Sequence, residues 1–203
     1  MRSFNEPVRV GITGGIASGK SLAAAWFERS GFPVFYADLV AKSIPETNAE
    51  VRSALIGYFG EQAFLPDNRL NRPFLASAIF GSEENRLWMN QLIHPLVLQA
   101  FKTFCNEHDT AEMIIHEAAL IYQSGFDKHL DFVIFISASE ELRINRALSR
   151  GMDSPEAVRQ RIMAQGDLTV FEKKADFLLF NTGTPEELEA KLETTLRAIR
   201  SHH

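Results

Sequence analysis

Short apolar runs recur along the chain, and the stretches between them bring an apolar residue back every three or four positions. Apolar runs bounded by turn residues are typical of strands buried on both faces, and the intervening pattern is typical of amphipathic helices. Because helical patterns separate the runs, the sequence predicts an α/β fold with a parallel sheet covered by helices on both faces. The five predicted strands are Arg9–Thr13, Pro33–Tyr36, Met113–His116, Phe132–Ser137 and Phe177–Phe180.

One connection between these strands is much longer than the others. The chain from Tyr36 to Met113 exceeds what a single crossover helix needs. It contains helical patterns near Glu50–Phe59, Arg72–Phe80 and Glu83–Phe104. We therefore expect an inserted helical lobe over about residues 39–108 that binds the substrate. The predicted core comprises residues 1–38, 109–142 and 175–203, and ends in a helix over Pro185–Arg200.

A smaller excursion, over about residues 143–174, is rich in arginine. Gly151 is expected to end one helix, and Ser154 followed by Pro155 has the pattern of a helix start. We favour a mobile lid here, because guanidinium groups stabilise the negative charge that spreads over a transferred phosphoryl group. For each arginine taken singly, a solvated helix face is the alternative. The arginines are Arg143, Arg146, Arg150, Arg159 and Arg161.

Composition and charge narrow the class of protein. The 203 residues are 45% hydrophobic and 23% charged, which is typical of a globular domain. The net charge of −5 offers no basic surface for nucleic acid. Cys105 is the single cysteine, which excludes an internal disulfide and favours a helix-packing role. No run is long enough to span a membrane and MRSFNEP lacks a secretion-signal pattern, so we expect a cytoplasmic protein.

The most specific motif is VGITGGIASGKS, which lies between the first predicted strand and a helix over Ser21–Arg29. The spacing G-x-x-x-x-G-K-S is that of a phosphate-binding loop, in which backbone N–H groups and a helix N-terminus surround an anion. Lys20 would reach the β- and γ-phosphates, and the Ser21 hydroxyl would ligate Mg²⁺. An ordinary glycine turn is the alternative. The predicted ATP-binding loop residues are Gly14, Gly15, Ile16, Ala17, Ser18, Gly19, Lys20, Ser21 and Leu22.

Other motifs select among proteins that carry such a loop. The chain has neither the N-K-x-D nor the D-x-x-G motif of regulatory GTPases, and the run Phe132–Ser137 does not end in the acidic pair of motor and transporter ATPases. Instead, FPVFYAD places Asp38 at the carboxyl end of a strand, where open parallel sheets bind ligands. A carboxylate there would accept a proton from an acceptor hydroxyl or help to hold magnesium. The alternative for Asp38 is an N-cap of the helix LVAKSI.

Glu117 is a second acid at the end of a predicted strand, directly after MIIH. Its position leaves two readings open. Glu117 either orients the acceptor or a magnesium-bound water, or it is a solvated loop acid.

With these motifs in chain order, nearly the whole sequence resembles the dephospho-coenzyme A kinase family. The resemblance starts at VGITGGIASGKS and continues through FPVFYADLVAK, LNRPFLASAIF, LIHPLV and SRGMDSPEAVRQRIMAQ to KKADFLLFNTGT. The ordered set is more specific than the loop alone, which many kinases share. It implies a three-layer P-loop kinase fold with a five-stranded parallel sheet, an inserted helical substrate lobe and a small helical lid.

The resemblance also implies roles at the donor side. Asp38 matches the family's strand-end aspartate, the expected catalytic base, and would act with Lys20 and Arg146. Arg150 in the lid would bind ATP. A loop near the adenine would contain Asn181 and Gly183.

On the acceptor side, His94 and its neighbour Pro95 lie in the inserted lobe. Because His94 follows Leu92 and Ile93, a hydrogen-bonded core histidine is the alternative to acceptor contact. The residues that the resemblance implies for acceptor binding are Asp38, Arg72, His94, Glu117, Arg161 and Gln165.

The chain departs from the family pattern after the third strand. The family commonly has D-x-P-L-L-x-E where this chain has EAALIYQ. Glu117 keeps the charge of the aspartate, Ala119 replaces the proline, and Gln123 removes a carboxylate. Leu22 replaces the usual second hydroxyl after the lysine, whereas Ser21 at the magnesium position is retained.

The implied reaction transfers the γ-phosphoryl group of ATP, with Mg²⁺, to the ribose 3′-hydroxyl of dephospho-CoA, the last step of coenzyme A synthesis. A long insertion suits this long acceptor. We expect a small-molecule substrate, no nucleic-acid or membrane partner, and a monomer or weak homo-oligomer. The competing hypotheses are a kinase of the same fold for a nucleotide or nucleoside, a slowly hydrolysing regulator, and a family member without activity, for which Gln123 is the only hint.

Overall fold

The computed structural model describes residues 6–151 and 154–202. The chain divides into two compact units, one formed by Met1–Phe35 with His108–His203 and the other by Tyr36–Glu107. Met152 and Asp153 of the predicted lid, and residues 1–5 and 203 of the predicted core, lie outside the described residues. The boundaries of the predicted core, insertion and lid stay predictions.

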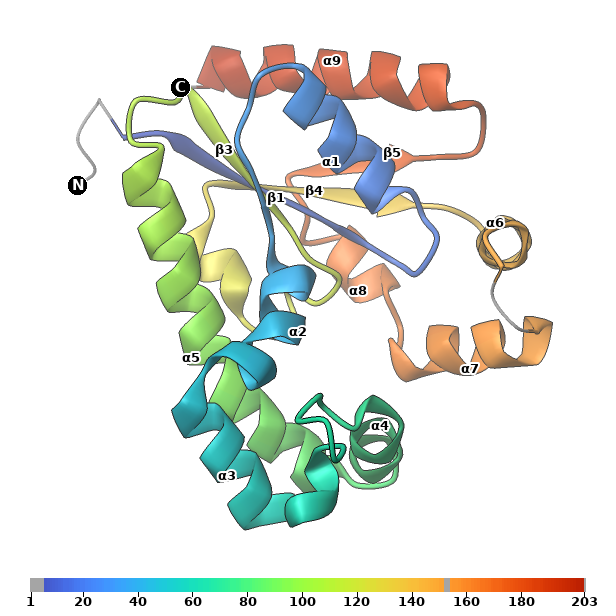
Figure 1. The fold of residues 1–203 in the computed structure, drawn as a ribbon. Helices are drawn as coiled ribbons and strands as arrows, with labels where there is room; N and C mark the ends of the chain where they lie inside the picture. Colours follow the sequence, from blue (N-terminus) through green and yellow to red (C-terminus); the bar gives the residue numbers. More distant parts are fainter. Residues whose placement is uncertain (1–5, 152–153, 203) are drawn as a thin grey trace. The chain divides into compact units, whose positions relative to one another are not determined.

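A five-stranded parallel sheet is the centre of the first unit, with the strand order β2-β3-β1-β4-β5 (Figure 1). In this sheet β1 is parallel to both neighbours, with Val8 opposite Met113 and Val10 opposite Phe132. The predicted parallel sheet is confirmed, and each predicted strand is found to within one residue at either end. The strands are β1 (Val8–Gly14), β2 (Val34–Tyr36), β3 (Met113–Glu117), β4 (Phe132–Ser137) and β5 (Phe177–Phe180).

Helices cover the sheet on both faces, as the apolar runs predict. The helices α1 (Lys20–Arg29) and α9 (Pro185–His202) pack against each other, and α8 (Thr169–Glu172) contacts β4. In Figure 1, α1 and α9 lie above the strands and α8 lies below them. This cover explains why the middle strands are mostly apolar: Val10, Ile12, Ile114, Ile115, Ile134 and Ile136 are all inaccessible to solvent.

The arginine-rich excursion forms α6 (Glu140–Ser149) and α7 (Pro155–Ala164), which pack together through a small apolar cluster. Gly151, with a φ of +83°, follows the end of α6. The Ser154 hydroxyl caps α7 by accepting a hydrogen bond from the Ala157 N–H at 3.1 Å, and Pro155 is the first residue of the helix. The predicted stop and start signals are therefore confirmed.

A buried histidine lies among the apolar residues of the sheet. The ring of His116 in β3 stacks on Phe35 and on Phe126 of the short helix η2 (Phe126–His129), with centroid distances of 5.5 and 4.0 Å. Burial, with a smaller contribution from the charge of His129, lowers the pKa of His116 to about 3. His116 is therefore neutral at physiological pH.

The second unit consists mainly of helices, as predicted for the insertion. Asparagine side chains start two of them: Asn48 accepts from the Val51 N–H at 3.0 Å, and Asn71 accepts from the Phe74 N–H at 3.3 Å. Cys105 is buried in the last helix, consistent with a packing role. The elements are α2 (Ala37–Thr47), α3 (Ala49–Phe59), η1 (Glu61–Ala63), α4 (Arg72–Phe80) and α5 (Glu83–Glu107).

Candidate active site

The loop between β1 and α1 contains two glycines that other residues cannot replace without strain. Gly14 has a φ of +148° and Gly19 a φ of +116°, values that side chains with a β-carbon rarely adopt. A β-carbon on Gly14 would overlap the carbonyl oxygen of Ile136 in β4, and one on Gly19 would overlap the amide nitrogen of Asn181. The loop thus passes directly against β4 and the chain after β5.

Hydrogen bonds within the loop hold Lys20 over it. The Lys20 ammonium donates to the carbonyl oxygens of Gly14 and Gly15 at 3.1 and 3.2 Å, and the Ser18 N–H donates to Gly15 at 3.1 Å. Lys20 and Ser21 are the first residues of α1, so the positive end of the helix dipole faces the loop. Ser21 is exposed there and Leu22 is half-buried. This arrangement has the donors and the charge that an anion site needs.

Asn181 connects the loop to the chain after β5. Its side-chain amide donates to the carbonyl oxygen of Ser18 at 2.8 Å, and its backbone N–H donates to Ser137 at 2.7 Å. The Arg146 guanidinium donates to the carbonyl oxygens of Asn181 and Gly183, at 3.0 and 3.3 Å, and to the Asn181 side-chain oxygen at 3.4 Å. Three predicted site residues, Arg146, Asn181 and Gly183, are therefore brought together beside the loop.

Gln165 also contacts the loop. This residue follows α7, and its side-chain oxygen accepts a hydrogen bond from the Ile16 N–H at 2.8 Å. The structure thus places a predicted acceptor-binding residue on a backbone N–H group of the phosphate loop. Arg150, directly after α6, and Arg161, in the last turn of α7, are both exposed.

For each of the two strand-end acids, Asp38 and Glu117, the structure excludes one of the two interpretations that the sequence left open. The helix α2 begins at Ala37 and has Tyr36 as its N-cap, so Asp38 lies in the first turn and the N-cap interpretation is wrong. An acid in the first turn still stabilises the helix through its dipole. Glu117 is the last residue of β3 and only 7% exposed, so the interpretation as a solvated loop acid is also wrong.

Asp38, Arg72 and His94 belong to the second unit. The Arg72 guanidinium donates to the Lys42 carbonyl oxygen at 3.2 Å and to the Glu46 carboxylate at 3.1 Å. His94 is half-buried in α5, and burial lowers its pKa from the usual value. Both readings of His94 stay open.

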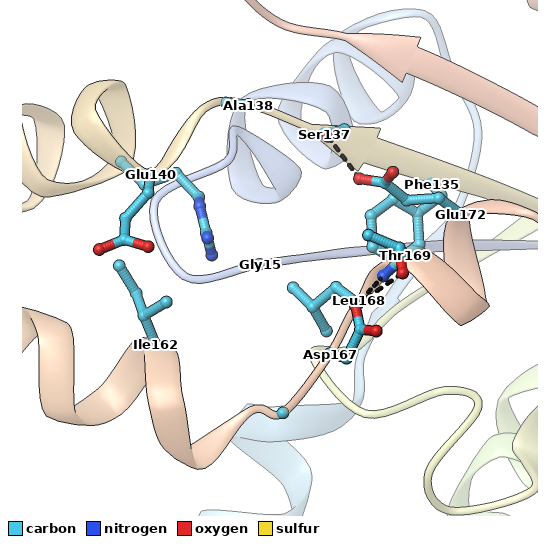
Figure 2. Close-up of a pocket in the computed structure, with 12 residues that line it drawn as sticks. Gly15, Phe135, Ser137, Ala138, Glu140, Ile162, Asp167, Leu168, Thr169 and Glu172 are labelled. Atoms are coloured by element: carbon cyan, nitrogen blue, oxygen red, sulfur yellow. Dashed lines mark hydrogen bonds between the residues drawn. The ribbon is translucent and has the colours of Figure 1, made fainter.

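A cavity of about 250 Å³ lies beside Gly15, between the end of β4 and the segment around α8 (Figure 2). Ser137 donates to the Glu172 carboxylate across it at 2.6 Å, a contact drawn in Figure 2. Sequence reasoning did not single out Ser137 or Glu172, because neither belongs to a motif. The lining residues are Gly15, Phe135, Ser137, Ala138, Glu140, Arg143, Ile162, Gly166, Asp167, Leu168, Thr169 and Glu172.

Comparison with known proteins identifies the family. The family model described as dephospho-CoA kinase matches residues 8–187. The chain belongs to the dephospho-CoA kinase family. A dephospho-CoA kinase of Salinibacter ruber is 36% identical over 184 residues, which cover 90% of this chain and 92% of the relative. The family and the kinase class expected from the sequence are confirmed, and members of this family phosphorylate dephospho-CoA with ATP to give coenzyme A.

Solved structures agree with the fold. The crystal structure of TT1252 from Thermus thermophilus superposes with a TM-score of 0.83 at 30% identity, covering 97% of this chain and 98% of that one. A shikimate kinase from Aquifex aeolicus, 16% identical, has a TM-score of 0.52 over 97% of this chain and all of its own, and shows likeness of fold alone. The predicted P-loop kinase fold is confirmed. None of the helices within residues 6–151 and 154–202 is long and apolar enough to cross a membrane.

Proposed function

We propose that this chain transfers the γ-phosphoryl group of ATP to the 3′-hydroxyl of dephospho-CoA, the reaction of its family. The observation that supports this most directly is the glycine-lined loop of residues 14–19 with Lys20 held over it, in a chain of this family. The cytoplasmic location and the monomeric or weakly oligomeric state stay predictions from the sequence.

The proposed donor site is built around this loop. Its N–H groups and Lys20 would bind the phosphates, because an ammonium and a helix N-terminus both stabilise negative charge. Arg146 supports the loop through its hydrogen bonds to Asn181 and Gly183, which we assign to the adenine side of the nucleotide. Arg150 and Arg161 are exposed, and we assign them to the donor and acceptor respectively.

The residues of the loop fit a magnesium ion. Mg²⁺ in such sites takes few protein ligands and is held mainly by phosphate oxygens and water. Ser21 is exposed in the first turn of α1 and has a hydroxyl to offer, whereas the described residues contain no group of three or more acids, histidines or cysteines placed to hold a metal ion. When bound at Ser21, the ion would neutralise charge on the phosphates.

In the proposed step, the 3′-hydroxyl oxygen forms a bond to the γ-phosphorus while the bond between that phosphorus and the β-γ bridging oxygen breaks, and ADP leaves. The hydroxyl proton passes to the Asp38 carboxylate. Arg72, His94, Glu117 and Gln165 are the remaining proposed acceptor-binding residues.

The test is ADP release from Mg·ATP in the presence of dephospho-CoA, CoA, adenosine or nucleoside monophosphates, with the product identified by mass spectrometry. We expect turnover with dephospho-CoA and a product heavier by one phosphate. Turnover only with a nucleotide or nucleoside would reassign the chain to another acceptor, and ATP binding without acceptor-dependent ADP release would indicate a regulator or an inactive family member.

Replacing Asp38 with asparagine tests the proposed base. The asparagine side chain has nearly the same shape as aspartate but cannot take the proton, so turnover of Asp38→Asn should fall by roughly 100- to 10,000-fold while ATP binding is retained. The matched control is Asp67→Asn, which changes an exposed aspartate of the same unit that pairs with Arg69 on the surface. Near-normal turnover of Asp38→Asn would remove Asp38 from the base role.

A further inference from the structure

Two arginines of α6, three residues apart, differ in their hydrogen bonding. Arg146 donates three hydrogen bonds to Asn181 and Gly183. Arg143 instead places its guanidinium against the phosphate loop: a β-carbon on Gly15 would overlap its Nη1 and lie 3.2 Å from its Cζ. A side chain at position 15 would therefore displace this guanidinium from its place on the loop.

The Arg143 side chain is half-buried, and two of its guanidinium nitrogens have no hydrogen-bond partner among the described residues. Among the described residues, Nε and Nη1 of Arg143 are closed off from solvent and donate to no acceptor. A buried N–H group that lacks an acceptor destabilises a protein, and more so when the group is charged. Burial lowers the pKa of Arg143, and the nearby carboxylates of Glu140 and Glu172 oppose this shift. An arginine nevertheless keeps its charge in proteins.

Two of the three acids that line the cavity, Glu172 and Asp167, already accept hydrogen bonds from other donors. Glu172 accepts from the Ser137 hydroxyl at 2.6 Å. Asp167 accepts from the Thr169 N–H and hydroxyl, at 2.9 and 2.7 Å, as drawn in Figure 2. The charged Arg143 side chain therefore lies near carboxylates that already accept hydrogen bonds from neutral groups. An arrangement that costs free energy in the ligand-free protein is typical of a residue kept for a ligand.

We propose that Arg143 is a further residue that contacts the phosphate groups of the nucleotide. Its unpartnered N–H groups are closed off from solvent in the ligand-free protein, and on binding they turn to donate to phosphate oxygens at the Gly15 edge of the loop. The planar guanidinium fits this role, because its parallel N–H groups match two oxygens of a phosphate. The inference rests on the proposed function, and it adds a contact that the loop motif does not contain.

Charge decides where the anion lies. Glu140, Asp167 and Glu172 all line the cavity, so its interior repels a phosphate. The edge at Gly15 belongs instead to the loop that leads into the positive end of α1, and the Nη1 atom of Arg143 lies there. The phosphates therefore bind at the edge, with Arg143 between them and the acids.

The experiment measures ATP and inorganic tripolyphosphate binding by calorimetry for wild type, Arg143→Gln, Arg143→Lys and the control Arg197→Gln. Arg197 is an exposed arginine of α9 that pairs with Glu193. We expect binding of both ligands to weaken by roughly 10- to 100-fold in Arg143→Gln, by less in Arg143→Lys, and not at all in Arg197→Gln. Binding by Arg143→Gln within about threefold of wild type would overturn the proposal.

Thermal unfolding of the ligand-free proteins separates this role from a structural one. Because the cation is unsatisfied without a ligand, Arg143→Gln should leave the midpoint unchanged or raise it, and should shrink the shift that ATP adds. A lowered midpoint of the ligand-free variant, in Arg143→Gln and Arg143→Lys alike, would show that Arg143 holds the fold together and would overturn the proposal.

The outcomes also separate this inference from the proposed function. If the wild type binds ATP but transfers nothing to dephospho-CoA, the proposed function fails while the binding comparison still decides the role of Arg143. If the wild type binds neither ATP nor tripolyphosphate, both fail.

Discussion

The phosphate loop and the segment α6–α8 both supply proposed nucleotide contacts, but they are constructed in different ways. The loop is made by backbone: two glycines at positive φ press against Ile136 and Asn181, and its glycine oxygens hold Lys20. The segment α6–α8 is made by side chains, some hydrogen-bonded like Arg146 and some exposed like Arg161. A change in the loop therefore alters the site's shape, whereas a change in α6–α8 removes one contact at a time.

The largest effect is expected from Lys20→Ala in the loop. This variant removes the ammonium that Gly14 and Gly15 hold, so phosphoryl transfer should fall by roughly 1000-fold or more because no other group of the loop supplies a positive side-chain charge. The measurement is kcat/KM with ATP, and Lys128→Ala in η2, an exposed lysine, is the control. Full activity of Lys20→Ala would refute the phosphate-loop interpretation.

Gly19→Ala tests whether ATP binding depends on the backbone conformation of the loop. Gly31 is the matched position, because it also has a positive φ, +89°, but has nothing within 4 Å of an added β-carbon. Both alanines incur about 1–2 kcal/mol of backbone strain. Only Gly19→Ala also displaces Asn181, and we expect it alone to weaken ATP binding, by roughly 100-fold. ATP binding is measured by calorimetry. Equal binding in the two variants would refute the view that the loop's backbone conformation determines the site's shape.

Arg146→Gln, within α6, and Arg150→Gln, directly after it, should distinguish an arginine that supports the loop from one that contacts the nucleotide. Loss of the Arg146 hydrogen bonds to Asn181 and Gly183 should lower the free energy of unfolding by about 1–3 kcal/mol and raise KM for ATP roughly tenfold. Arg150 is exposed, so its variant should change KM for ATP with unfolding unaltered. Urea unfolding and initial rates distinguish the two, and an unfolding loss in Arg150→Gln of the same size would contradict this division.

The smallest expected effect is a pH dependence of the free energy of unfolding, which His116 causes for the whole folded chain. Because the pKa of His116 is about 3 in the folded state and near 6.5 when unfolded, the unfolded chain binds a proton between these values and the folded chain does not. The stabilisation is therefore complete above about pH 6.5 and is lost as the pH falls towards 3. From pH 6 to pH 5 the free energy of unfolding should fall by about 1 kcal/mol.

Urea titrations at pH 6 and pH 5 test this pH dependence. His116→Gln should remove it, whereas His129→Gln, an exposed histidine in the same contact group, should retain most of it. A variant at His116 with the wild-type pH dependence would assign the acid sensitivity to another group. The binding comparisons above are cleanest above pH 6.5.

The sequence was most informative where backbone geometry restricts residue choice. The spacing of Gly14, Gly19 and Lys20 predicted the loop, and Ser154 with Pro155 predicted the start of α7, because each position admits few residue types. The N-cap interpretation of Asp38 placed the start of α2 two residues too late, since a short strand can pass directly into a helix without a polar cap. The guanidinium of Arg143 at Gly15 had no sequence signal, because contacts between distant segments depend on how α6 packs.

The hydrogen bond from the Ile16 N–H to Gln165 affects how the loop binds and releases phosphate groups. The Ile16 N–H already has an acceptor, so a phosphate oxygen that takes this N–H displaces a neutral amide and leaves the number of hydrogen bonds there unchanged. The favourable free energy comes from the charge on the phosphate oxygen, which strengthens the hydrogen bond, and from the conformational entropy that the Gln165 side chain regains. When ADP departs, the same side chain can take back the N–H, so the loop is not left with an unsatisfied donor between turnovers.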